Sequence, residues 1–172
     1  DVFTKKYTDL FLSDLEKLNI EKPHLLPLAT EYIKEMVEMI GALLEKNIAY
    51  VSNDGVYMSI GLVKNYGALA GIKLTDEVQS RINNDEYEKE NPRDFALWKF
   101  HVESDGEVVW LAPFGDGRPG WHIECSAMSI KNLGETFDVH TGGIDLMFPH
   151  HVNEIAQSES ATGKKFVNYN PK

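Results

Sequence analysis

The side chains best suited to chemistry in this sequence are one cysteine and a group of histidines and glutamates near its end. In "PHHVNEIAQSE", His150 and Glu154 are four residues apart. On a helix beginning at Pro149 these two side chains share one face. Cys125, in "WHIECSAM", would add a thiolate from a neighbouring helix. Cys, His and Glu are typical zinc ligands, and three protein ligands leave the open position that marks a catalytic or substrate-binding zinc.

The same residues also have ordinary structural interpretations. A lone buried cysteine is more often an inert small hydrophobic residue than a ligand. His151 points about 100° away from His150 around the helix, so it is the weaker ligand candidate and we expect it to support the site by hydrogen bonding. His122 either orients the zinc site or is structural. The spacing is not HExxH, which excludes the metalloprotease interpretation.

Two further motifs could bind a small substrate. "HTGGID" follows a predicted short strand, and Gly142 and Gly143 permit the backbone to approach a nucleotide or acyl phosphate closely. His140 and Asp145 would project near such a ligand, although an ordinary strand-to-helix turn explains the motif equally well. In "GRPGWH", Trp121 either forms the wall of a small pocket or belongs to the core.

The elements that would position these residues alternate between helix and strand from Phe95 onward. "FALWKF" and "EVVWLAPF" predict strands joined by the turn "ESDGE", and "GDGRPG" predicts a tight loop. "WHIECSAMSIKNLG" and "PHHVNEIAQSESATG" predict helices that end at glycines, with the short strand "FDVHTGG" between them. This alternation is typical of an α/β fold.

The earlier part of the chain predicts helices and a hairpin. Apolar residues at helical spacing predict an amphipathic helix over 3–18, and Thr30 is the expected cap of a second helix. "IAYVSNDGVYMSI" predicts a β-hairpin, and the polar stretch 76–94 predicts a solvated loop or short helix. We therefore predict an insertion of helices and hairpin at 1–94, followed by an α/β half at 95–172.

Composition limits the class of protein. A length of 172 residues suits one domain, or one domain with an insertion. The net charge of -10 argues against a surface built to bind nucleic-acid phosphates, but not against a nucleic-acid enzyme whose basic surface lies elsewhere. A single cysteine cannot form an internal disulfide, which favours a reducing, cytoplasmic setting. No apolar run approaches the roughly 18 residues of a membrane helix, so we expect no membrane association.

Together these motifs make the chain similar to a known family. "GRPGWHIECSAM", "HTGGIDLMFPHHVNEIAQSE", "FALWK" and "ATEYIKEM" resemble cysteinyl-tRNA synthetase, a class I aminoacyl-tRNA synthetase, and the similarity extends over essentially the whole chain. The resemblance implies a Rossmann-like catalytic domain of which this chain holds the insertion and the second half. It also implies a fragment that lacks the HIGH and KMSKS signatures for ATP phosphates and is inactive alone.

The resemblance further implies a reaction and a ligand set. Members of this family activate cysteine with ATP and Mg²⁺ to cysteinyl-adenylate, and then transfer the cysteinyl group to tRNA(Cys). They bind one zinc ion through two cysteines, a histidine and a glutamate. Three of these ligands correspond to Cys125, His150 and Glu154, and the other cysteine belongs to an N-terminal part that this chain lacks. We expect a monomer.

By the same resemblance, the remaining motif residues bind substrate. Trp121 and His140 would line the amino-acid pocket, and Gly142 and Gly143 would let the adenylate approach the backbone. Asp145 is expected to contact either a ribose hydroxyl or the cysteine ammonium group. Two alternatives stay open: a ligase of the same family that joins activated cysteine to an amino sugar in mycothiol synthesis, and a non-catalytic zinc-binding module.

Overall fold

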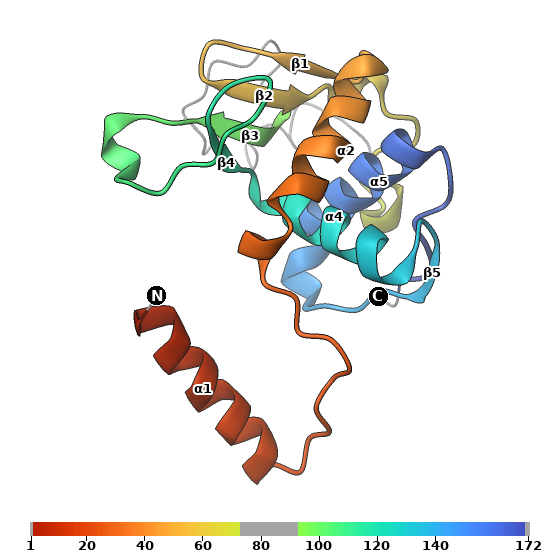
Figure 1. Ribbon diagram of the computed structural model, residues 1–172. Coiled ribbons are helices and arrows are strands. Elements are labelled where there is room, and N and C mark those ends of the chain that lie inside the picture. The colour runs from red at the N-terminus through yellow and green to blue at the C-terminus, as the bar shows by residue number, and fades with distance from the viewer. Residues whose placement is uncertain (1, 73–92, 171–172) are drawn as a thin grey trace.

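The computed structural model describes residues 2–72 and 93–170 (Figure 1), so the polar stretch predicted at 76–94 lies almost entirely outside the described residues. Its α-helices are α1 (Val2–Lys17), α2 (Ile33–Glu45), α4 (Trp121–Leu133) and α5 (Val152–Thr162). Its strands are β1 (Ala49–Val51), β2 (Gly55–Met58), β3 (Phe95–Phe100), β4 (Gly117–Pro119), β5 (Phe137–Val139) and β6 (Val167–Tyr169). No helix among the described residues is long and apolar enough to cross a membrane.

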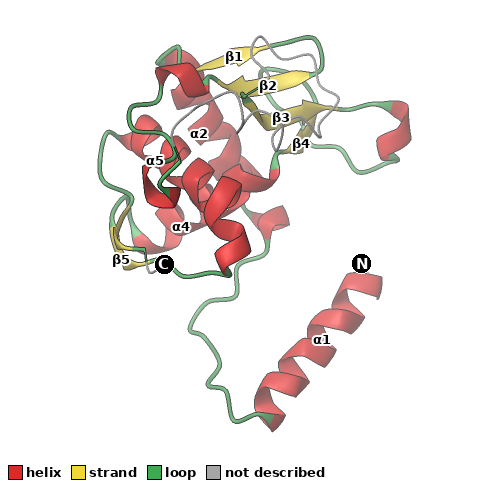
Figure 2. Ribbon diagram, turned by 180° about the vertical axis from the view of Figure 1, so that it is seen from behind, coloured by secondary structure: helices red, strands yellow, loops and turns green. Residues whose placement is uncertain are grey.

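Helix α1 confirms the helix predicted over 3–18, but it stands away from the other elements (Figures 1 and 2). It has no buried residue, and its aromatic residues Phe3, Tyr7 and Phe11 are exposed. Exposed ion pairs such as Lys5–Asp9 at i,i+4 add only a few tenths of a kcal/mol to such a helix. None of the candidate site residues lies on α1.

Helix α2 begins later than the sequence predicted. Thr30 lies inside a short 3₁₀ turn, Ala29–Glu31, and the residue before α2 is Tyr32, whose side chain makes no capping bond. The predicted cap at Thr30 is therefore wrong. A tertiary contact explains the difference, because the Tyr32 hydroxyl lies 3.2 Å from Asn132 Oδ1 on α4 and thereby fixes the start of α2 against that helix.

The first four strands form one antiparallel sheet in the order β1-β2-β3-β4. The predicted hairpin is confirmed, with Ala49 opposite Met58, and "FALWKF" is confirmed as β3. Two glycines allow the strands to pair. A Cβ at Gly55 would lie 2.3 Å from the Trp98 carbonyl oxygen, and one at Gly117 would lie 1.9 Å from that of Lys99.

One predicted strand in this region is wrong. "EVVWLAPF" forms no strand, and its only ladder contact is an isolated bridge between Trp110 and Gly117. The neighbour of β3 on the side away from β2 comes instead from "GDGRPG", where the sequence predicts a loop and the structure has β4. Glycine lowers strand propensity, but here its missing side chain is what lets the two backbones approach.

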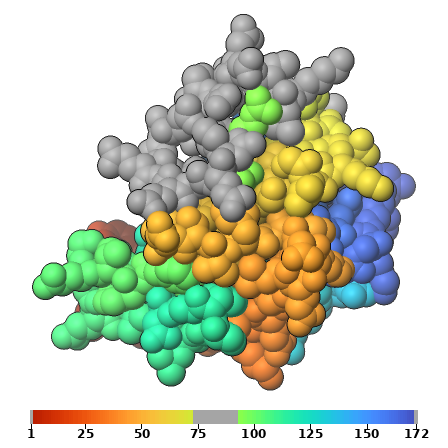
Figure 3. All heavy atoms as spheres, turned by 90° about the horizontal axis from the view of Figure 1, so that it is seen from above, coloured from red at the N-terminus to blue at the C-terminus, as the bar shows by residue number. Residues whose placement is uncertain are grey.

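The sheet continues across the predicted boundary near residue 94. Strand β2 pairs with β3, and Asp94, which is 1% exposed, accepts hydrogen bonds from the Tyr50 hydroxyl and the Ile60 amide. One apolar core includes residues from both sides: Met36, Ile40, Leu43, Val56, Leu97, Trp98, Ile123 and Val152. In the space-filling view, the orange and yellow surface of the earlier residues directly adjoins the blue surface of the later ones (Figure 3). The division into an insertion and a catalytic half stays a prediction.

The C-terminal elements form the α/β unit that the sequence predicted. Strands β5 and β6 pair in parallel, with Phe137 opposite Val167, and α5 lies between them in the chain. A parallel pair needs such a crossover connection. Helix α4 packs beside α5 (Figure 1), and the two helices end at Gly134 and Gly163, both with positive φ. This pairing of α4 and α5 positions the candidate site.

Candidate metal centre

The candidate ligands lie between α4, α5 and the segment that leads into α5. Residues Met147–His151 form a π-type turn before α5, with Phe148 in an extended conformation. This turn carries both histidines of "PHHVNE" into the interior, where His150 and His151 are each 5% exposed. The helix predicted to begin at Pro149 is thus confirmed in outline, but its first turn is irregular and the α-helix begins at Val152.

The structure brings the three predicted zinc ligands together. Donor atoms of Cys125, His150 and Glu154 all lie within 4.8 Å of one another. His150 Nε2 is 3.7 Å from Glu154 Oε2, as expected for side chains four residues apart on one helix. Cys125 is half-buried on α4, facing them from the neighbouring helix. These ligands come from two separate motifs, and the packing of α4 on α5 is what unites them.

A second group of potential ligands shares the same glutamate. Donor atoms of His140, His151 and Glu154 also lie within 4.8 Å of one another. His140 Nε2 is 3.0 Å from Glu154 Oε2, and the His140 and His151 rings meet edge to face at 4.5 Å. The sequence predicted His151 only as support and His140 only as a substrate contact. No spacing in the chain could reveal their convergence, because His140 precedes the turn and reaches Glu154 only through the fold.

Two buried atoms in this cluster have no hydrogen-bond partner. Glu154 Oε2 and His140 Nδ1 are both unsatisfied, even though Glu154 is only 1% exposed. Although His140 Nε2 is near, its direction does not make a hydrogen bond to that oxygen. A buried carboxylate oxygen without a hydrogen bond lowers the folding stability by about 1–3 kcal/mol or more. A divalent cation ligated by Glu154, His150 and Cys125 would remove that cost, so the residues present fit zinc.

The protonation states at the site favour metal binding by the histidines. Burial lowers the pKa of His150 and of His151, which keeps their rings neutral, and a neutral imidazole is the form that binds a metal. Burial, reinforced by the carboxylates of Glu154 and Glu124, raises the pKa of the Cys125 thiol to about 11. A bound cation reverses that effect, because a coordinating thiol is deprotonated.

The remaining predicted residues lie at different distances from the cluster. Trp121 stacks on the His150 ring at 4.4 Å and 18° and is 55% exposed, so of its two interpretations the core residue is excluded and the pocket wall stays a prediction. Gly142 lies against the site, because a Cβ there would be 2.5 Å from His151 Nε2. A Cβ at Gly143 would meet only Asp145 Oδ1, at 2.3 Å. Asp145 is exposed and belongs to neither donor group.

One contact at the site is new relative to the expectations from sequence. His122 Nδ1 lies 2.8 Å from His150 Nδ1, a hydrogen-bond distance between two imidazole rings. Burial, with the nearby His150 ring, lowers the pKa of His122 to about 3. His122 is therefore neutral and in direct contact with a candidate ligand, whereas the sequence alone does not distinguish an orienting from a structural role for it.

This mixed α/β unit, with donor groups at the meeting of α4 and α5, agrees with the comparison with known families. The chain belongs to the family described as tRNA synthetases class I (C) catalytic domain, whose model matches residues 1–170. Among individual proteins, it is 52% identical over 170 residues to a cysteine–tRNA ligase of Brachyspira hyodysenteriae, covering 97% of this chain. It is 53% identical over 173 residues to a cysteine–tRNA ligase of Protochlamydia amoebophila, covering 98% of this chain. The chain spans 36% of the length of each of these relatives.

Proposed function

We propose that the protein containing this chain is an ATP-dependent cysteine–tRNA ligase, which forms cysteinyl-adenylate with Mg²⁺ and ATP and then charges tRNA(Cys). The observation that carries the proposal is the convergence of Cys125, His150 and Glu154 around an unsatisfied carboxylate oxygen. The two relatives named cysteine–tRNA ligase support the same conclusion. We propose further that this protein is monomeric and cytoplasmic.

The residues of this chain would bind and orient the amino acid. Cys125, His150 and Glu154 would hold one zinc ion, which supplies a Lewis acid with a strong preference for thiolate over a neutral hydroxyl. Trp121, half exposed and stacked on His150, is placed to cover that side of the site. His140, partly buried beside Glu154, would present its Nδ1, which has no hydrogen-bond partner, to the substrate.

The same arrangement would explain the selection of cysteine. An apolar pocket separates cysteine poorly from serine, alanine or valine, because a difference of one small group, such as a methylene or a hydroxyl, changes binding by only about 1–3 kcal/mol. Direct binding of sulfur to zinc separates them further, since alanine and valine offer no ligand at all. Gly142 and Gly143 would allow the adenylate to approach the backbone, with Asp145 contacting its ribose or the ammonium group.

The test uses the full-length protein. We expect about one zinc per chain, cysteine-dependent exchange of pyrophosphate into ATP, and charging of tRNA(Cys). Glu154→Gln should abolish both zinc retention and exchange. The matched control is Glu159→Gln, which removes a charge from the same helix at an exposed position and keeps an oxygen to accept the Phe166 amide.

The outcomes separate the alternatives. Exchange that occurs with transfer only to an amino sugar would assign the mycothiol-type ligase. Zinc binding without any exchange would leave a non-catalytic zinc module. Exchange that persists unchanged after zinc is lost would contradict the proposed role of the metal in selecting cysteine.

A further inference from the structure

The His150 ring is held on two sides, and this decides which nitrogen faces the cluster. Its Nδ1 lies 2.8 Å from His122 Nδ1, and its face stacks on Trp121 at 4.4 Å. The other nitrogen, Nε2, points toward Glu154, 3.7 Å from Oε2. Nε2 is therefore the atom of His150 that can bind a metal, because Nδ1 is engaged in the hydrogen bond with His122.

The hydrogen bond between the two rings has two possible directions, and only one is compatible with a metal. A neutral imidazole carries one proton, and a metal takes the lone pair of the other nitrogen. If Nε2 of His150 binds the metal, its proton must lie on Nδ1, and His122 Nδ1 must accept it. In the opposite direction His122 donates, the His150 proton lies on Nε2, and that proton blocks the metal.

We propose that His122 is a positioning residue that accepts the Nδ1–H of His150 and so fixes the tautomer that presents Nε2 to zinc; this rests on the proposed metal centre. Metal-binding histidines generally donate their second N–H to a carboxylate, a backbone carbonyl or water, which orients the ring. Here the acceptor is a neutral imidazole. It orients His150 without adding a negative charge to a site that already contains a thiol and a carboxylate.

The structure holds His122 well enough for this role. Its ring packs edge to face on Phe95 of β3, with centroids 5.5 Å apart at 88°, and it also lies beside Trp121 at 5.1 Å. It stands three residues before Cys125 on α4, so one helix supplies both a proposed ligand and the acceptor that orients another ligand. A change at His122 therefore acts on the metal through His150.

Zinc affinity in the full-length protein tests the proposal, measured by competition with a chelator of known affinity. His122→Phe keeps a planar ring but removes the acceptor, and we expect zinc binding to weaken by about 10–100-fold. His122→Asn restores an acceptor oxygen and should retain most of the affinity. A merely structural role for His122 would not be rescued by the smaller Asn side chain.

Nitrogen-15 NMR of histidine-labelled protein gives an independent readout on the unaltered chain. In the zinc-loaded protein we expect the proton on Nδ1 of His150 and on Nε2 of His122. A proton on Nδ1 of His122 overturns the inference, as does a folded His122→Phe protein that binds zinc as tightly as the parent. If the parent binds no zinc, the metal centre itself is wrong, and the inference falls with it.

Discussion

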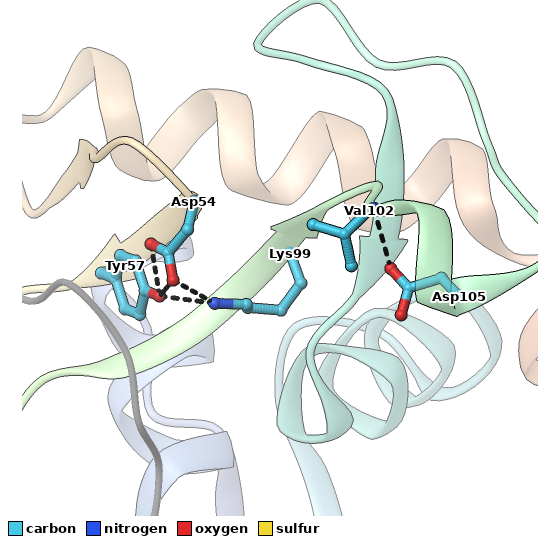
Figure 4. Close-up of polar contacts among 5 residues, drawn as sticks. All are labelled: Asp54, Tyr57, Lys99, Val102 and Asp105. Carbon is cyan, nitrogen blue, oxygen red and sulfur yellow. Dashed lines mark hydrogen bonds and ion pairs between the residues drawn. The ribbon is translucent and has the colours of Figure 1, made fainter.

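Two polar clusters among the described residues differ in whether their central carboxylate has a hydrogen-bond donor. Around the hairpin, the Asp54 carboxylate accepts from the Tyr57 hydroxyl at 2.8 Å and from Lys99 Nζ at 2.6 Å (Figure 4). Around α5, the Glu154 carboxylate oxygen Oε2 has no hydrogen-bond donor. Both carboxylates lie inside the protein, but Asp54 pairs with a lysine, whereas the nearest basic groups to Glu154 are the imidazoles of His140 and His150.

The presence or absence of a partner for the buried carboxylate separates a structural cluster from a binding site. Burial of a charged group is tolerated where a partner of opposite charge and hydrogen bonds offset the lost hydration. Asp54 meets that condition through Lys99, so its cluster stabilises the sheet. Glu154 is surrounded by imidazoles and a thiol, which are typical metal ligands, and no lysine or arginine pairs with it among the described residues. The missing positive charge is what the proposed zinc would supply.

The largest change in zinc affinity is expected from a substitution that alters only the cluster around α5. Cys125→Ser replaces a thiolate with a hydroxyl, a much poorer zinc ligand, and should weaken zinc binding by more than about 100-fold, beyond the usual cost of an outer contact. Chelator competition on the full-length protein measures this change. Lys99→Met and the volume-conserving Met128→Leu on α4 should leave zinc affinity unchanged. If Lys99→Met weakened zinc binding as much as Cys125→Ser, the two clusters would not be functionally distinct.

The second prediction concerns folding stability, which we expect to fall when the Asp54 cluster is broken and not to fall when Glu154 is replaced. Lys99→Met leaves Asp54 without its counter-ion, and because Asp54 is 30% exposed we expect a loss of about 2 kcal/mol rather than the full cost of a buried pair. In metal-free protein, Glu154→Gln removes a buried carboxylate whose Oε2 has no hydrogen bond and adds amide hydrogens that the neighbouring imidazoles can accept, so stability should hold or rise.

Denaturant unfolding with and without a chelator measures both effects. The exposed Lys22 offers a matched control, since Lys22→Met should change stability by less than about 0.5 kcal/mol. A loss of stability in metal-free Glu154→Gln comparable to that of Lys99→Met would mean that Glu154 is already paired, and would argue against a cation site.

The third prediction uses pH. Burial opposes ionisation of Asp54, but hydrogen bonds from Lys99 and Tyr57 more than offset it, so its folded pKa lies below the ordinary 3.8. A lowered folded pKa means that the stabilisation is complete above about pH 5 and is lost as the pH falls through 3.8 toward the folded value. The stability difference between the parent and Asp54→Asn should therefore shrink on acidification from pH 6 to pH 3. A difference that stays constant with pH would show that Asp54 is not ion-paired in solution.

The sequence predicted the parts of both clusters that depend on local spacing. The i,i+4 pair of His150 and Glu154 and the hairpin that carries Asp54 follow from helical and strand periodicity, which neighbouring residues determine. The start of α2 at Ile33 and the pairing of β3 with β4 did not follow, because tertiary contacts with Asn132 and a close backbone approach at Gly117 decided them.

The same limit applies to the site. The sequence predicts that Cys125 and His150 lie on neighbouring helices, and in the structure their donor atoms lie within 4.8 Å of each other. The roles of His122 and His151 do not follow from the sequence, because they depend on which ring nitrogen meets which neighbour. That information lies in side-chain geometry, and no residue spacing encodes it.

The smallest change in zinc affinity is expected from a substitution beside the cluster around α5, which tests how tightly that cluster is packed. Gly142→Ala would place a Cβ 2.5 Å from His151 Nε2, and His151 is 5% exposed and packed against His140, so the ring has little room to move. We expect zinc affinity to fall by no more than about tenfold, the lower end for an outer contact. Gly143→Ala is the matched control, because its Cβ would meet only the side chain of exposed Asp145, which can rotate away. Equal zinc affinities in the two variants would show that His151 does not help to shape the metal site. His151 would then no longer be counted among the residues that support that site.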